Sequence, residues 1–261
     1  MPSIRDWLSL EQDKRWRDAL VAIVVAALLL RLAVVLLRPP VAEEVLTPLA
    51  DSTDYHHLGE PTAFRPPVYP IFLTTIYALF GKGNLLAVAL VQVLLGTLNC
   101  LLAAGVGRLA GISREGAAAA ALVFAVYPAY VLQTVQILTE VLARTQLLAA
   151  VWLLLWAFRR GQWKWYALAG AAMALAILNK SALGAAAPFI GLVVIYFSGT
   201  NWRERTIRAG AYALAAAIIL GAWTGRNYAV SGRFIPISTN FSITFAQGVT
   251  KWSYYTNEWY E

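Results

Sequence analysis

The stretch LADSTDYHHLGE, at residues 49–60, concentrates six titratable side chains in a chain that is otherwise mostly apolar. Its titratable residues are Asp51, Asp54, Tyr55, His56, His57 and Glu60. A carboxylate can take a proton from an attacking hydroxyl group, and carboxylates or histidines can hold a divalent metal ion. Adjacent histidines point in different directions on a regular element, so at most one should serve a site, and we consider His56 a candidate metal ligand.

A second polar group lies inside an apolar segment. It consists of Gln133, Gln136, Glu140 and Arg144, at spacings of three, four and four residues. On a continuous helix these side chains would share one face. Glu140 and Arg144 could then form an ion pair that orients the helices. Alternatively, the face is a polar wall that directs Glu140, as a catalytic residue or metal ligand, toward one end of the helix.

Side chains suited to phosphate binding come from segments far apart in the sequence. They are Arg65, Tyr69, Lys180, Arg226 and Arg233, together with Tyr55 of the first stretch. Arginine binds phosphate through a planar fork of donors, and lysine binds it as a point charge. If these segments meet beside lipid headgroups, the resulting pocket would suit a lipid-linked phosphate facing a carboxylate.

The elements that must position these residues are apolar helices. The chain has 261 residues, of which 59% are hydrophobic and 13% charged, and a mean hydropathy of +0.60. A soluble domain usually carries about 25% charged residues, and a membrane-crossing helix needs about 20 apolar ones. We therefore predict an all-α integral membrane protein. Its one cysteine, Cys100, can form no disulfide within the chain.

The apolar runs predict about seven transmembrane helices, at 19–37, 84–107, 116–131, 137–158, 165–178, 182–197 and 209–223. The shorter run from Tyr69 to Phe80 fits a helix lying at the membrane surface better than a crossing. We expect a cytoplasmic segment at 1–18, a transmembrane module at 19–225 with its first outer loop at 38–83, and an outer tail at 226–261. Arg31, within the first run, is expected to extend its charge to the outer end.

The basic residues favour one orientation, with the N-terminus in the cytoplasm. With seven crossings, most of them fall on the inner side, namely Arg5, Lys14, Arg15, Arg17, Arg108, Arg114, Arg159, Arg160, Lys164, Arg203, Arg205 and Arg208. This is the positive-inside bias of membrane proteins. It accounts for the net charge of +7 without a nucleic-acid partner, and it places Asp51 and Glu140 on the outer side.

Four stretches resemble lipid-linked-sugar-dependent glycosyltransferases of the GT-C superfamily, in the branch of protein O-mannosyltransferases and aminoarabinose transferases. They are ADSTDYHHL, PTAFRPPVYPIFLTTIYALFG, YPAYVLQTVQILTEVLA and WTGRNYAVSGRFIPISTN. The resemblance implies a polyprenyl-phosphate sugar donor and a site at the outer membrane surface, in the plasma membrane of a bacterium. It gives Asp51 the role of general base, with inversion, and places Glu140, Arg65, Lys180 and Arg226 near the donor phosphate, the sugar or a divalent metal ion.

The sequence departs from the family pattern at Asn179-Lys180-Ser181, where Thr-Arg-Pro is usual, and at Val68, where Gly is common. Family members commonly continue through further spans, so we expect a fragment, a minimal enzyme or one half of a split one, with an unknown acceptor. Two other hypotheses stay open. One is a non-catalytic or split GT-C-like subunit that binds a polyprenyl-phosphate carrier beside a second subunit. The other is a transporter that uses the charges within the spans.

Overall fold

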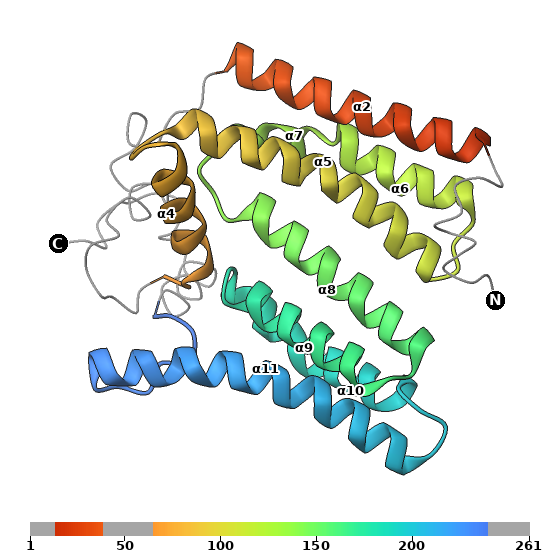
Figure 1. Cartoon of the computed structure of the whole chain (residues 1–261), viewed down its shortest axis with the longest axis vertical. Coiled ribbons are helices and arrows are strands. Elements are labelled where there is room, and N and C mark those ends of the chain that lie inside the picture. The colour runs from red at the N-terminus through yellow and green to blue at the C-terminus, as the bar shows by residue number, and fades with distance from the viewer. Residues whose placement is uncertain (1–13, 39–64, 240–261) are drawn as a thin grey trace, which may run out of the picture.

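The structure is a computed structural model that describes residues 14–38 and 65–239, and this part of the chain is built of helices without strands. Figure 1 shows their arrangement. The elements are α2 (Lys14–Leu37), α4 (Val68–Phe80), α5 (Leu85–Leu109), α6 (Arg114–Val126), α7 (Pro128–Leu132), η2 (Gln133–Val135), α8 (Glu140–Arg160), α9 (Trp163–Ile177), η3 (Ser181–Ala186), α10 (Ala187–Phe197) and α11 (Trp202–Ser231).

The helices confirm an all-α membrane protein, but they do not confirm the predicted count of seven crossings. Within the described residues, α2, α5, α8 and α11 are long and apolar enough to cross a membrane. A fifth crossing results if α6 and the following 128–135 segment, bent by 54°, form one broken span. The combined η3 and α10 segment is shorter than a standard crossing, and so is α4, which matches the predicted surface helix at its position in the sequence.

The bundle has two chemically different ends, which Figure 1 separates from left to right. We call the left one the α4 end, because it carries α4, the start of α8 and the ends of α9 and α11. The right one is the cation end, where α2, α6, α9 and α11 begin and α5, α8 and α10 finish. Its described basic residues are Lys14, Arg15, Arg17, Arg108, Arg114, Arg159, Arg160, Lys164, Arg203, Arg205 and Arg208.

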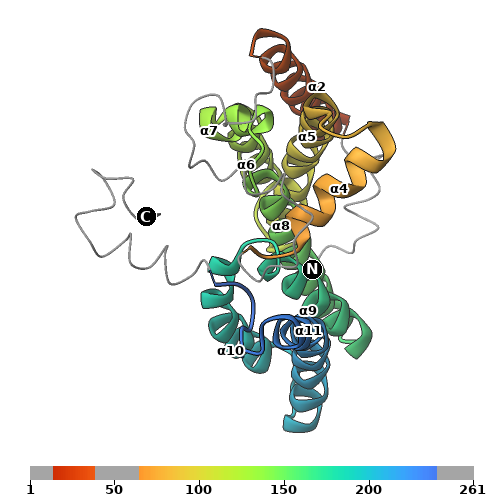
Figure 2. The same ribbon diagram turned by 90° about the vertical axis from the view of Figure 1, so that its left-hand side faces the viewer.

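Helix α8 joins two groups of helices. Figure 2 shows α2, α5, α6 and α7 on one side of it and α9, α10 and α11 on the other. In the second group a buried cluster around Tyr166, Met173 and Tyr212 ties α8, α9 and α11 together. The backbones of α9 and α11 approach so closely that a Cβ atom on Gly170 would lie 2.1 Å from the Tyr212 carbonyl oxygen. Glycine is therefore needed at this crossing.

Arg31 does not reach the outer end of its helix as expected. Its side chain is buried, with 1% of the residue's surface exposed, and its Nη2 donates to the Phe124 carbonyl at 2.7 Å. Its Nη1 donates to Ala125 at 3.2 Å and to Ala27 at 3.1 Å. Pro128 has no N–H and so cannot pair with the Phe124 carbonyl four residues earlier. The guanidinium therefore donates to backbone carbonyls that lack helical partners where α6 ends. Because these carbonyls need donors inside the bundle, the buried position of Arg31 is favoured over extension to water.

Candidate functional site

The described part of the α4 end contains an ion pair between two residues predicted to serve the site. Lys180 Nζ lies 2.6 Å from Glu140 Oε1. Glu140 begins α8, and Lys180 lies in the turn between α9 and η3. The two side chains are 29% and 40% exposed, so both stay accessible to a ligand at this end. The pair therefore joins a carboxylate and a cation that are distant in sequence.

The segment before α8 explains why Glu140 lies at a helix start rather than within a helix. The backbone of Gln136 is extended, with ψ at 140°, after the short η2 helix. The predicted shared face of Gln133, Gln136, Glu140 and Arg144 was wrong, because no continuous helix links these residues. An acidic residue in the first turn is favoured by the partial positive charge of a helix N-terminus. The sequence therefore identified Glu140 but not the backbone that places it.

Arg144 does not form the ion pair with Glu140 that their spacing allowed. Its Nη2 donates to Gln133 Oε1, and its guanidinium lies over the Tyr130 ring, 3.9 Å from the centroid. Both contacts come from the α7 and η2 segment that follows the Pro128 break. Arg144 therefore ties α8 to that segment, which leaves Glu140 to pair with Lys180.

Gln92 of α5, which was not among the predicted site residues, binds the same segment from the other side. Its Nε2 donates to the carbonyl oxygens of Thr134 at 3.1 Å and Gln136 at 2.9 Å. Its Oε1 accepts a hydrogen bond from the Tyr69 hydroxyl at 3.2 Å. Gln92 and Tyr69 are fully buried. Tyr69, predicted to bind the donor, is thus a buried link between α4 and the segment that leads to Glu140. A glutamine within an apolar run was the signal that could have drawn attention to this position.

The start of α4 lies against the turn that carries Lys180. The Val68 N–H donates to the Leu178 carbonyl at 3.2 Å, and the preceding Pro66 and Pro67 are buried. Arg65, directly before these prolines, is half-buried. The hydrogen bond between Val68 and Leu178 therefore brings the Arg-Pro-Pro segment close to the turn that carries Lys180. The buried side-chain amide of Asn179 has no hydrogen-bond partner among the described residues.

Arg226 and Arg233 lie where α11 ends. Arg226 Nη1 donates to Asn227 Oδ1 at 3.2 Å, and the guanidinium lies 4.8 Å from the Trp223 ring centroid. Asn227 is buried, and its amide donates to the Ile235 and Ile237 carbonyls at 3.0 and 3.2 Å, which folds the following segment back along α11. Ile237 in turn lies beside Gly184 of η3. The stretch containing Arg226 is thereby connected to the turn of Lys180, whereas Arg233 is exposed.

Three predicted site residues, Asp51, Tyr55 and His56, lie outside the described residues, and their roles remain predictions. A metal site at Glu140 or His56 also remains a prediction. Within residues 14–38 and 65–239, no three His, Cys, Asp or Glu side chains form a group that could hold a metal ion. A metal at Glu140 would therefore need a ligand from another part of the chain or from the substrate.

Comparison with known proteins supplies the family. No curated protein and no solved structure is significantly similar to this chain. A family model described as dolichyl-phosphate-mannose-protein mannosyltransferase matches residues 64–223. The match includes Arg65, Tyr69, Glu140 and Lys180, and it spans more than half of the chain. The chain therefore belongs to the dolichyl-phosphate-mannose-protein mannosyltransferase family and is a membrane glycosyltransferase of the GT-C type.

Proposed function

We propose that the protein transfers a sugar from a polyprenyl-phosphate carrier to an acceptor hydroxyl at the α4 end, and that this end faces the outside of a bacterial plasma membrane. The observation that carries the proposal is the partly exposed Glu140–Lys180 pair within the family match. The cation-rich opposite end supports the orientation, because cytoplasmic loops carry the excess of lysine and arginine.

The proposed reaction is a single displacement. The acceptor oxygen attacks the anomeric carbon as the bond between that carbon and the phosphate oxygen breaks. The acceptor proton passes to the Asp51 carboxylate, and the polyprenyl phosphate leaves with the electron pair of the broken bond. Attack opposite the leaving group inverts the anomeric centre. The step needs a base within about 3 Å of the acceptor hydroxyl.

Lys180 is the cation we propose for the departing phosphate, because negative charge grows there in the transition state. Glu140 holds the ammonium group in the resting site at 2.6 Å. An entering phosphate would share Lys180 with Glu140, or Glu140 would turn toward the sugar or a metal ion. Arg65 and Arg226 would add charge around the phosphate, with Arg233 and Tyr55 further contributors. Tyr69 acts by holding α4 in place, since its hydroxyl binds Gln92.

The test follows consumption of the donor, because the acceptor is unknown. The full chain is reconstituted in liposomes with radiolabelled decaprenyl-phosphate mannose and a bacterial membrane extract, and label leaving the lipid fraction is measured. Asp51→Asn should reduce transfer about 100-fold or more, the usual contribution of a general base. Asp54→Asn, in the same stretch, is the matched control and should retain activity. Full activity in Asp51→Asn would remove Asp51 from the mechanism.

The same assay addresses the non-catalytic alternative. Purified chain that retains polyprenyl phosphate but turns over donor only when a second polypeptide is added would favour a split enzyme. Turnover by the chain alone would exclude that reading.

A further inference from the structure

A hollow of about 380 Å³ opens at the cation end, at the opposite end of the bundle from the Glu140–Lys180 pair. It lies between the start of α9 and the first turns of α11. The residues that line it are Gly161, Gln162, Trp163, Lys164, Glu204, Ile207 and Arg208. The two helices that form its walls, α9 and α11, pack closely against each other at Gly170 and Tyr212. The proposed sugar transfer makes no use of it.

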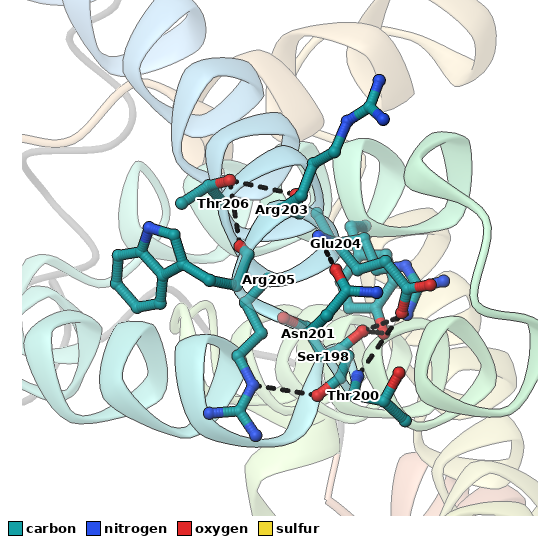
Figure 3. Close-up of polar contacts among 11 residues, drawn as sticks. Ser198, Thr200, Asn201, Arg203, Glu204, Arg205 and Thr206 are labelled. Atoms are coloured by element: carbon teal, nitrogen blue, oxygen red, sulfur yellow. Dashed lines mark hydrogen bonds and ion pairs between the residues drawn. The ribbon is translucent and has the colours of Figure 1, made fainter.

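One side of the hollow is a closed polar network. Arg208 Nη1 lies 3.1 Å from Glu204 Oε2 and also donates to the Ser198 carbonyl. Asn201 Oδ1 accepts from the Glu204 N–H at 2.9 Å, and Arg205 Nε donates to the Gly199 carbonyl at 2.9 Å. Figure 3 shows Asn201 and Glu204 next to each other at the turn before α11, whereas Arg203 points away from them. The charges of Arg208 and Glu204 are therefore mutually compensated.

Two neighbouring cations remain uncompensated. Lys164 lines the hollow, and Arg203 lies one helical turn before the lining residue Ile207, on the same face of α11. Both are exposed, and neither side chain has a hydrogen bond or ion pair within the described residues. The hollow and its rim thus carry positive charge that no other part of residues 14–38 and 65–239 neutralises.

Each of these cations follows an exposed tryptophan. Trp163 is 54% exposed and precedes Lys164, and Trp202 is 71% exposed and precedes Arg203. Ile207 adds an apolar wall that is 51% exposed. Tryptophan is enriched at the depth of lipid headgroups, and lysine or arginine beside it can reach the phosphate layer. An apolar rim beside unpaired cations matches a molecule with an anionic head and an apolar body.

We propose that this hollow binds the headgroup of an anionic phospholipid, with its phosphate near Lys164 and Arg203 and its glycerol and acyl region against Trp163 and Ile207. A zwitterionic lipid fits less well, since its own ammonium group would meet the same cations. This site is independent of the sugar-transfer site, and it would anchor the α9 and α11 helices in the membrane leaflet at the cation end.

The test uses the detergent-solubilised full chain and native mass spectrometry. The protein is titrated with dioleoylphosphatidylglycerol or with dioleoylphosphatidylcholine of the same chain length. A cation in contact with an anionic headgroup contributes about fivefold to the affinity, so removing the two that the site supplies should cost about thirtyfold. We expect Lys164→Gln combined with Arg203→Gln to lower phosphatidylglycerol affinity by that factor and to leave phosphatidylcholine binding unchanged.

The matched control removes two exposed cations from another helix at the same end, Lys14→Gln combined with Arg15→Gln. It should change phosphatidylglycerol binding by less than about threefold. An equal loss in both double variants would show that the whole end attracts lipid without a site, and would overturn the proposal. Equal affinity of the wild type for the two lipids would also overturn the proposal.

Displacement of phosphatidylglycerol by millimolar inorganic phosphate would identify phosphate alone as the ligand. Trp163→Ala should weaken both lipids, which separates the apolar contact from the ionic one.

Discussion

The two ends of the bundle use charged side chains for different purposes. At the cation end, arginine side chains donate hydrogen bonds to backbone carbonyls. For example, Arg159 Nη2 donates to the Leu109 carbonyl at 2.7 Å, where α5 ends. Cations near a helix C-terminus are favoured by its dipole and complete its open hydrogen bonds. At the α4 end, Lys180 instead pairs with a carboxylate from another helix. The first arrangement stabilises helix ends, and the second leaves a cation and an acid accessible to a ligand.

The largest expected difference between the ends concerns activity. Lys180→Met should reduce sugar transfer about 100-fold, the usual cost of losing one group that stabilises charge in a transition state. Thermal unfolding should change little, because a partly exposed ion pair contributes about 0–1 kcal/mol. The matched control is Lys82→Met, an exposed lysine in the turn between α4 and α5. If Lys180→Met kept full activity, the accessible pair would be as structural as the caps of the opposite end.

Arg31 tests whether a cation inside the bundle behaves like the capping arginines. Arg31→Leu should lower the free energy of unfolding by about 2–4 kcal/mol, since it leaves the Phe124 and Ala125 carbonyls without donors. The measurement is thermal unfolding of purified protein in detergent. Arg38→Leu, at the exposed end of the same helix, serves as control and should shift stability by about 0.5 kcal/mol or less. Equal stability of both variants would refute the capping role.

The smallest effect is expected for a single cap at the cation end. Arg159→Gln should lower stability by about 1 kcal/mol, the net value of one hydrogen bond, and leave sugar transfer within about twofold of wild type. Thermal unfolding and sugar transfer are both measured on the same preparation of purified protein. A loss of transfer comparable to that of Lys180→Met would remove the functional distinction between the two ends.

Much of the helical layout could be predicted from hydropathy and from breaks in the sequence. The short helix predicted from Tyr69 to Phe80 appears as Val68–Phe80, and the first apolar run appears as a helix ending at Leu37. The number of crossings could not be predicted as well, because α9 and α10 are apolar but short and the chain bends by 54° between α6 and the segment that begins at Pro128. Hydropathy records how apolar a segment is, and it does not record where its axis turns.

Residue type and helical spacing made different contributions to the candidate site, whose functional roles remain predictions. Glu140 and Lys180 were each proposed for the same end, whereas helical spacing also allowed Arg144 as a partner of Glu140. The structure reverses this pairing because the chain between Gln133 and Glu140 is not helical, so the expected face does not exist. Gln92 and Tyr69, which hold that segment, are linked across 23 residues of sequence, and no local pattern connects them.

The sequence by itself determined the class of molecule, much of its helical layout and the chemistry of its polar residues, because hydrophobicity and side-chain type are local properties. Only the tertiary structure decided which charges meet: Arg31 with released carbonyls, Arg144 with Gln133, and Lys180 with Glu140. In a low-dielectric bundle each polar group needs a partner, and the partner is whichever group the packing brings within reach.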